Sequence, residues 1–373
     1  MLFRFIIVPF LMMIPVGIYL FFYLLRIANF WRVERILKKV KVVAALIAVC
    51  LSLWSVNLFG YGALIVLHIV GIALLMEVLN FICTALHKFM GININTWNKI
   101  FRSGLVPVII TGLIIGYGYY NMKNVVETDY TIHTGKLIRQ DGYRIAMIAD
   151  LHFGTTMNEE KLKKYCNDLE AKKPDLVVLC GDIVDQRTTF SQMKNAAYIL
   201  GNIKSSYGTF YVYGNHDKSR YGSARNFDAH QLENELISNG IHVLEDEIYH
   251  INNEFTVIGR KDKGFSSEHT RKTCEELIKN VDANNFLLLL DHQPSKLQEN
   301  SRAGIDLQLS GHTHGGQIWP EGLFNGITGV GELSYGHKKI DKYQIIVSSG
   351  IAGWGYPIRT QCHSEYVIVD VRR

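Results

Sequence analysis

The longest uncharged stretch of this chain constrains its fold more than any other feature. Residues 42–76, 35 positions in all, contain no Lys, Arg, Asp or Glu. As a helix this stretch would be ~52 Å long at ~1.5 Å per residue, which is too long for one crossing of a ~30 Å hydrocarbon core and enough for parts of two. The turn-forming residues Asn57, Gly60 and Gly62 lie near its middle. The stretch therefore predicts two neighbouring membrane-spanning helices joined by a short turn.

Residues 5–25 and 103–120 are further apolar runs without a charged residue. The first is too long for a secretory signal peptide, and no small-residue cleavage site follows it. We therefore predict an all-α transmembrane region over 1–120, with about four spans near 5–25, 42–59, 62–84 and 103–120. Glu77 lies inside the third span. We expect it to reach the membrane interface or to face a neighbouring helix rather than to have a function of its own.

The basic residues of the loops predict an orientation. Residues 1–120 contain ten Lys and Arg but only two acidic residues; six of the ten lie in 26–41 and three in 85–102. Cytoplasmic loops are rich in Lys and Arg, so both loops should be cytoplasmic. With an even number of spans, we predict a multi-pass protein of the cell membrane whose chain after residue 120 is extracytoplasmic; an odd number would reverse this. Because the basic excess lies beside apolar runs, we predict no nucleic-acid binding.

The remaining residues, 121–373, have the length of one large α/β domain. Short apolar runs rich in β-branched residues alternate there with amphipathic segments. We interpret 121–142 as a linker leading into a domain over 143–373, and predict an α/β fold built in layers, a β-sandwich flanked by helices. The expected strands are 143–148, 175–179, 209–212, 286–290, 306–309, 343–347 and 366–371, with more strands in 241–259 and helices near 158–172, 190–204, 227–238 and 269–281.

Polar residues follow five of the expected strands directly. Because the carboxyl ends of parallel strands meet at one edge of a sheet, these residues should converge. Carboxylates, imidazoles and an amide without thiolate suit Mn, Zn, Fe or Co, and the cysteines form no C-x-x-C pair that would favour a structural zinc site. The candidates are Asp150 and His152, then Asp182 and Asp185, then Asn215, His216 and Asp217, then Asp291 and His292, and finally His312 and His314.

In this order the motifs resemble those of the calcineurin-like metallophosphoesterases, namely D-x-H, G-D-x-x-D, G-N-H-D, a single His and G-H-x-H. The resemblance covers roughly 130–373 and implies the layered calcineurin-like β-sandwich for the α/β domain. Residues 310–317, together with 356–359 and Glu365, resemble the branch that carries N-terminal membrane segments and an external catalytic domain.

The resemblance also implies a role for each candidate residue. His216 would protonate the leaving oxygen, Asp217 would orient the His216 ring, and Asp185 would hold the ligands in place. Two divalent metal ions would be bound, with Mn²⁺ favoured and Zn²⁺, Fe²⁺ or Co²⁺ as alternatives. One ion would be held by Asp150, His152, Asp182 and His314, and the other by Asp182, Asn215, His292 and His312, so that Asp182 bridges them.

From these residues we predict a membrane-anchored, metal-dependent phosphoric ester hydrolase that acts through a metal-bridged hydroxide. Tethering favours phosphodiester or pyrophosphate-type substrates, lipid-borne or part of the cell envelope, over free monoesters. The alternative is a catalytically silent metal-binding scaffold or receptor domain. Arg359 either contacts a substrate phosphate or is an ordinary surface residue.

Overall fold

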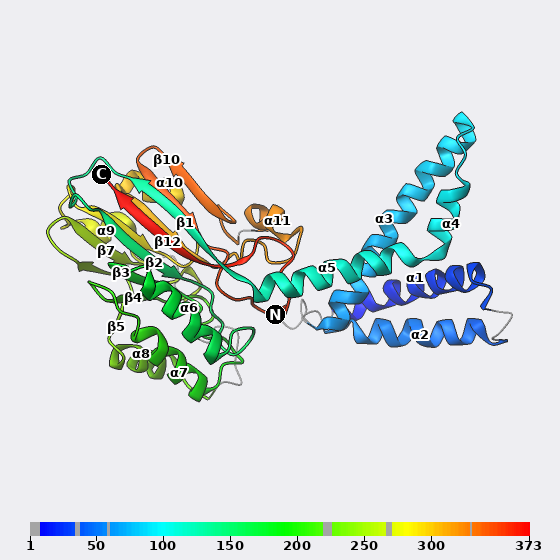
Figure 1. The fold of residues 1–373 in the computed structure, drawn as a ribbon, viewed down its shortest axis with the longest axis horizontal. Helices are drawn as coiled ribbons and strands as arrows, with labels where there is room; N and C mark the ends of the chain where they lie inside the picture. Colours follow the sequence, from blue (N-terminus) through cyan, green and yellow to red (C-terminus); the bar gives the residue numbers. More distant parts are fainter. Residues whose placement is uncertain (1–7, 34–37, 58–59, 219–225, 266–270, 329) are drawn as a thin grey trace. The chain divides into compact units, whose positions relative to one another are not determined.

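The computed structural model describes residues 8–33, 38–57, 60–218, 226–265, 271–328 and 330–373. The chain divides into two compact units, which we call the N-terminal unit (Met1–Gly118) and the C-terminal unit (Tyr119–Arg373). Figure 1 shows the helices and strands of both units.

The described part of the N-terminal unit consists of helices joined by short connections, without a strand. Three of its helices are long and apolar enough to cross a membrane, over Phe10–Phe30, Tyr61–Met90 and Leu105–Lys123. The expected span 42–59 contains a helix of only 15 residues, and residues 58 and 59 lie outside the described residues. An expected loop also contains an additional short helix, α4, which is too polar to be a span. The helices are α1 (Val8–Phe30), α2 (Val40–Trp54), α3 (Tyr61–Met90), α4 (Asn95–Ser103) and α5 (Leu105–Lys123), whose last turn belongs to the C-terminal unit.

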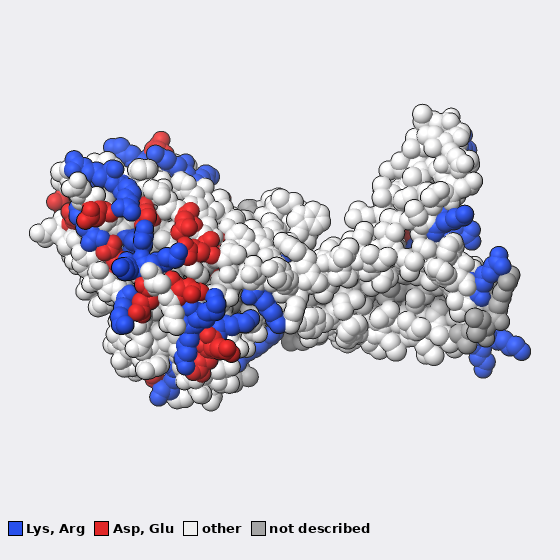
Figure 2. Space-filling view, viewed as in Figure 1, with Lys and Arg blue, Asp and Glu red and all other residues white. Residues whose placement is uncertain are grey.

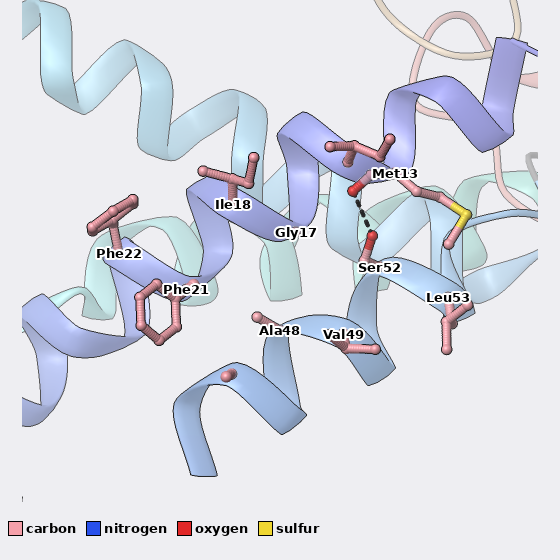
Figure 3. Close-up of a pocket in the computed structure, with 11 residues that line it drawn as sticks. Met13, Gly17, Ile18, Phe21, Phe22, Ala48, Val49, Ser52 and Leu53 are labelled. Atoms are coloured by element: carbon pink, nitrogen blue, oxygen red, sulfur yellow. Dashed lines mark hydrogen bonds between the residues drawn. The ribbon is translucent and has the colours of Figure 1, made fainter. Parts of the chain in front are cut away.

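Helices α1 and α2 pack closely along a small-residue contact (Figure 3). A Cβ on Gly17 would lie 3.4 Å from the Ser52 hydroxyl, and that hydroxyl donates a 2.7 Å hydrogen bond to the Met13 carbonyl. Small residues let helix backbones approach, and a buried hydroxyl can satisfy itself on a neighbouring carbonyl. The short helix α2 therefore lies against the apolar part of α1.

Glu77 of α3 forms an ion pair with Arg26 of α1, and the Tyr19 hydroxyl lies 3.4 Å from the same carboxylate. This agrees with the expectation that Glu77 faces a neighbouring helix. Its partner was not anticipated, because Arg26 lies at the end of a different span and only packing brings the two together.

The C-terminal unit contains two six-stranded mixed sheets. The first has the order β1-β12-β2-β3-β4-β5 and the second the order β10-β11-β9-β8-β7-β6. The strands are β1 (Val125–His133), β2 (Tyr143–Ile148), β3 (Leu176–Cys180), β4 (Thr209–Val212), β5 (Ile241–Val243), β6 (Glu247–His250), β7 (Phe255–Gly259), β8 (Phe286–Leu290), β9 (Leu307–Ser310), β10 (Gly336–Ile340), β11 (Tyr343–Val347) and β12 (Ser364–Arg372).

Side chains of β2 show how the layers form. Ile145 and Met147 point into the core between the two sheets, whereas Ala146 and Ile148 point into a core under helices. This alternation is the two-residue period of a strand that is buried on both faces. A third core lies between the second sheet and its helices. The helices are α6 (Glu159–Ala171), α7 (Phe190–Gly201), α8 (Ala229–Ser238), α9 (Cys274–Ile278), α10 (Leu297–Ala303) and α11 (Glu321–Thr328). The predicted α/β sandwich flanked by helices is confirmed.

One segment differs from its expected role. Residues 121–142, interpreted as a linker, contain β1, which pairs in parallel with β12 along nine residues. Most side chains of β1 are only half-buried, and the strand lies at the edge of its sheet. Such a strand carries polar residues on one face, and therefore lacks the apolar run that marks a central strand.

Candidate metal centre

Five strands end beside one another and deliver the expected residues to one buried place. The strands β2, β3 and β4 are mutually parallel in the first sheet, as are β7, β8 and β9 in the second. The loops after β2, β3, β4, β8 and β9 therefore open on the same edge. Among the residues buried at this edge are Asp150, His152, Asp182, Asp185, Asn215, His216, Asp217 and His292. Asp291 is also buried, but it pairs with Arg260 and Arg271 and belongs to neither group of ligand atoms described below.

The first group of ligand atoms comes from Asp150, His152 and His314, and these atoms lie within 4.8 Å of one another. The His152 and His314 Nε2 atoms are 3.3 Å apart, and His314 Nε2 lies 3.7 Å from Asp150 Oδ1. Burial lowers the pKa of His152 to about 4 and holds that of His314 well below its usual value. Both rings are therefore neutral near pH 7 and can offer a lone pair to a cation.

The second group comes from Asp182, His292 and His312, again within 4.8 Å. Asp182 Oδ2 lies 3.1 Å from His292 Nε2 and 3.9 Å from His152 Nε2. One carboxylate oxygen thus faces both groups. This is the geometry that a bridging ligand needs.

The charges in the second group complement one another. Burial acts to raise the pKa of Asp182, but the nearby His292, His216 and His152 together outweigh it and hold that pKa well below the usual value. Burial likewise acts to lower the pKa of His292, but Asp182 raises it. Burial lowers the pKa of His312 to about 3 and raises that of Asp150 to about 7. Buried carboxylates and imidazoles at this spacing fit divalent cations.

Hydrogen bonds to the backbone aim these side chains. His292 Nδ1 lies 2.7 Å from the Cys180 carbonyl, so Nε2 points to Asp182. The Asp150 carboxylate accepts from the His312 amide at 3.0 and 3.1 Å, and Asp182 Oδ1 accepts from the His216 amide at 2.8 Å. Such outer contacts fix the orientation of metal ligands.

The backbone at the site is strained. A positive φ occurs at Asp150, His152, Asp182, His312 and His314, with values between 40° and 72°. Residues other than Gly adopt this region at a cost of roughly 1–3 kcal/mol each, and such residues cluster at functional sites. The surrounding sheet therefore holds these loops in a conformation that they would not adopt alone.

Two glycines leave room for the carboxylates. A Cβ at Gly214 would lie 2.1 Å from Asp182 Oδ1, and one at Gly311 would lie 2.5 Å from Asp150 Oδ2. Any side chain at either position would displace a carboxylate. The Gly residues of the G-N-H-D and G-H-x-H motifs are thus required by close approach.

His216 lies beside the first group, with its ring centroid 5.2 Å from that of His152. Two neighbours of His216 were not expected from the sequence: the Gln186 amide, 2.8 Å from His216 Nδ1, and the Trp354 ring, 5.0 Å away. Gln186 directly follows the G-D-x-x-D motif, and this position was the only sign in the sequence that Gln186 could belong to the site. Trp354 belongs to a distant loop, and no motif marked it.

Asp217 and Asp185 support the loops. Asp217 accepts hydrogen bonds from the amides of Asp182 and Gly214, both at 2.7 Å, and from that of Val184 at 3.1 Å. Its expected effect on the His216 ring stays a prediction. Asp185 accepts from the Thr155 hydroxyl at 2.9 Å and lies 3.8 Å from His152 Nδ1.

Arg359 is fully buried, so the surface alternative for it is wrong. Its Nη1 donates to the His314 carbonyl at 2.6 Å and its Nη2 to the Ala352 carbonyl at 2.7 Å. The guanidinium therefore braces the loop that carries His314. Sequence could not reveal this, because both acceptors are backbone atoms of other segments.

Comparison with known proteins agrees with this geometry. Residues 143–316 match the family model described as calcineurin-like phosphoesterase. An uncharacterized metallophosphoesterase of Aquifex aeolicus is 34% identical over 71% of this chain and 98% of its own length. A "transmembrane protein with metallophosphoesterase domain" of Danio rerio is 26% identical over 73% of this chain and 63% of its own length.

Among solved structures, the crystal structure of a dimetal phosphatase from Danio rerio aligns with a TM-score of 0.40 and 11% identity, over 62% of this chain and 94% of that one. The sequence match to the Aquifex protein spans nearly all of that relative. The chain described here therefore belongs to the calcineurin-like metallophosphoesterase family and is a metal-dependent phosphoester hydrolase.

Proposed function

We propose that this protein is a membrane-anchored phosphodiesterase with a two-metal centre, and that its catalytic domain is extracytoplasmic. The observation that carries the metal centre is the position of Asp182 Oδ2, 3.1 Å from His292 Nε2 and 3.9 Å from His152 Nε2. A shared carboxylate is what two cations about 3.5–4 Å apart require.

The residues that would hold the ions divide between the two groups. Bound divalent ions would lower the pKa of water and offset the charge that develops on the phosphoryl oxygens. Mn²⁺ is the ion we favour, and Zn²⁺, Fe²⁺ and Co²⁺ suit the same donors. The ligands proposed for one ion are Asp150, His152, Asp182 and His314, and for the other Asp182, Asn215, His292 and His312.

His216 is the proposed general acid for the leaving oxygen. The Gln186 amide at its Nδ1 and the Trp354 ring beside it limit the rotation of the imidazole. A fixed ring is needed, because proton transfer demands hydrogen-bond reach to the leaving group. Asp217 accepts hydrogen bonds from the Asp182 amide after β3 and the Gly214 amide after β4. It thereby helps to hold the loop that carries His216 in place.

The hydrogen bonds of Arg359 support a diester substrate. Both terminal nitrogens of this buried guanidinium donate to carbonyls, so Arg359 is engaged away from any substrate. A phosphodiester carries one negative charge and a monoester carries up to two, so the diester needs less cationic compensation in a buried site.

The N-terminal unit supports anchoring and the proposed side. Within that unit, Figure 2 shows basic side chains gathered where α1 ends and α2 begins, and over α4. These are the two loops rich in Lys and Arg, which should be cytoplasmic. We count α2, a shorter apolar helix that packs against α1, as a fourth crossing beside the three longer helices, and four crossings would leave the C-terminal unit on the outer face. Digestion of that unit by protease added to intact cells would support this side, and protection until lysis would contradict it.

Hydrolysis assays test the activity. Purified full-length protein loaded with Mn²⁺ should hydrolyse bis-p-nitrophenyl phosphate faster than p-nitrophenyl phosphate. The variant His216→Ala should lose turnover while its metal content stays unchanged. If the metal-loaded protein hydrolyses no phosphoester offered, the catalytically silent scaffold becomes the better description.

A further inference from the structure

Helix α11 exposes a row of large apolar side chains. Leu323 and Ile327 are four residues apart on α11 and share one face, Phe324 follows Leu323, and Trp319 lies just before the helix. We call these four residues the apolar ridge. Their exposed fractions are 64% for Trp319, 66% for Leu323, 50% for Phe324 and 83% for Ile327. Elsewhere on this face of the C-terminal unit, Lys, Arg, Asp and Glu are spread over the surface, whereas the surface over α11 is white in Figure 2. A contiguous apolar surface of this kind marks an interaction site.

Hydrogen bonds hold the opposite side of α11 to the domain. The Gly322 amide donates to Gln361 Oε1 at 3.2 Å, and the Ser334 hydroxyl donates to the Gly322 carbonyl at 3.0 Å. Just before the helix, the Trp319 amide donates to the Thr360 hydroxyl at 2.9 Å. Because these hydrogen bonds hold one side of α11 to the domain, the apolar ridge on its other side faces outward.

The loop that holds α11 also holds the end of a candidate membrane span. Within the C-terminal unit, Asn121 in the last turn of α5 donates to the Cys362 carbonyl at 2.5 Å and to the Arg359 carbonyl at 3.0 Å. Ser364 donates to the Met122 carbonyl at 3.1 Å. The exposed Tyr120 lies in the same turn, and Tyr is enriched where helices leave the hydrocarbon core. One loop thus joins α11 to the place where the chain leaves the predicted bilayer.

The same helix is close to the metal centre along the chain and through contacts. It begins seven residues after His314, the last residue of the G-H-x-H motif, and Thr313 of that motif donates to the Ser334 carbonyl at 2.5 Å. Ser334 in turn contacts α11 through Gly322. The helix that carries the ridge is therefore tied to the loop that carries His312 and His314.

We propose that the apolar ridge inserts into the outer surface of the phospholipid bilayer and presents the metal centre to lipid-borne phosphodiesters. Membrane anchoring and hydrolysis are taken from the proposed function, but insertion of the ridge can be measured without hydrolysis. The surface that the ridge contacts is assigned to lipid, because the loop that holds α11 also binds the last turn of the proposed membrane span α5. Trp, Phe, Leu and Ile on a short helix are the residues that bury at the level of the headgroups, ~5–10 Å deep.

Depth measurement tests the insertion. The full chain is reconstituted in vesicles of phosphatidylcholine and phosphatidylglycerol, with Ile327→Cys carrying an environment-sensitive fluorophore. The matched control is Ile237→Cys on α8, which is also an exposed isoleucine of the domain surface. The unsubstituted chain, labelled in parallel, measures the signal from the native cysteines.

Lipids with a doxyl quencher near the headgroup should lower the emission at position 327 by about twofold or more and leave position 237 unchanged, because the quencher reaches the same shallow depth. Equal, unquenched emission from both positions would overturn the proposal. Emission that is shielded from water but not quenched by doxyl lipid would also overturn it, since a protein partner or a second copy would then cover the ridge.

A second pair of variants tests the presentation of substrate. Leu323→Glu combined with Ile327→Glu should lower hydrolysis of a phosphodiester on a vesicle lipid by about tenfold, and leave hydrolysis of bis-p-nitrophenyl phosphate unchanged. Ile237→Glu should change neither rate. Equal rates on the vesicle lipid for both variants would contradict the proposal. If the unsubstituted protein hydrolyses neither substrate, the proposed function fails, and the depth measurement still decides on insertion.

Discussion

The two units place apolar and charged side chains in opposite ways. In the N-terminal unit, large apolar residues such as Phe22, Leu75 and Phe81 are exposed, and the acidic Glu77 is matched by Arg26. In the C-terminal unit, apolar residues fill three cores, and carboxylates and imidazoles gather, buried, at one edge. The difference is the one expected if the N-terminal unit lies in a membrane, as proposed: lipid accepts exposed apolar surface, whereas water drives it inside.

The buried charges teach a second lesson. The N-terminal unit neutralises Glu77 with a side chain of its own. In the metal centre, burial lowers the pKa of His152 to about 4 and that of His312 to about 3, whereas the carboxylates around His292 raise its pKa in spite of burial. The rings of His152 and His312 are therefore neutral at pH 7 and keep a lone pair that a divalent cation can bind.

The largest effect is expected for Asp182→Asn. Loss of the shared carboxylate should remove both ions and lower kcat/KM by about 10³-fold, because the charge that stabilises the transition state goes with them. Metal analysis and hydrolysis of bis-p-nitrophenyl phosphate measure this. Asp168→Asn, at an exposed surface carboxylate, is the control. Full metal content in Asp182→Asn would show that the oxygen does not bridge.

Gly214→Ala should be the next most damaging change. The added methyl carbon would lie 2.1 Å from Asp182 Oδ1, so the carboxylate must move and the domain should lose about 1–3 kcal/mol of stability together with metal affinity. Thermal unfolding and metal titration measure the two effects. Gly135→Ala, which meets open space, should be neutral. If Gly214→Ala and Gly135→Ala have the same stability and metal affinity, the close approach of Gly214 to Asp182 is not required.

Glu365 should contribute to the loss of stability of the C-terminal unit at acid pH. This buried carboxylate accepts from the Ser349 amide at 2.9 Å and the Tyr335 hydroxyl at 3.0 Å. Burial acts to raise its pKa, but hydrogen bonds from His363, Thr128, Ser349 and Tyr335 outweigh burial and lower it. A lowered folded-state pKa contributes stability above the unfolded-state value, and this stability is lost as the pH falls through the folded-state value.

Glu365→Gln should therefore lower stability by about 1–3 kcal/mol at neutral pH and flatten its fall below about pH 4.5. Unfolding followed at a series of pH values measures the slope. Glu160→Gln, at an exposed position, should leave both unchanged. If the stability of Glu365→Gln falls at acid pH as steeply as that of the unsubstituted protein, groups other than Glu365 cause the fall.

The smallest effect concerns the pair in the N-terminal unit. Arg26→Gln leaves Glu77 without its partner and should cost about 1 kcal/mol, and adding Glu77→Gln should restore most of it. Thermal unfolding of the full chain in detergent compares the single and double variants. Additive losses would show that the two side chains do not stabilise each other.

Much of the C-terminal fold was predictable. The expected strands 143–148, 209–212, 286–290 and 343–347 coincide with β2, β4, β8 and β11, since central strands buried on both faces read as continuous apolar runs. The strands β1 and β10 lie at sheet edges, and β10 carries exposed side chains such as Lys338 and Lys339. Edge strands are half-solvated, so their sequences resemble loops.

The neighbours of the site were harder to predict than its motifs. Gln186, Trp354 and the bracing contacts of Arg359 come from packing between segments far apart in the chain. The exposure of α11 was likewise invisible, because Leu323 and Ile327 would suit a buried helix equally well. Pattern alone does not tell which apolar face a fold leaves uncovered.

The sequence by itself determined the two-part organisation, the alternating strands and helices, and the types of ligand at each strand end. Hydrophobic period and local turn chemistry are properties of neighbouring residues, and they survive without a fold. Only the tertiary structure decided that Asp182 Oδ2 faces both ligand groups, that Arg26 meets Glu77, and that the ridge on α11 stays exposed. These depend on distances between residues remote in sequence, which chain packing alone sets.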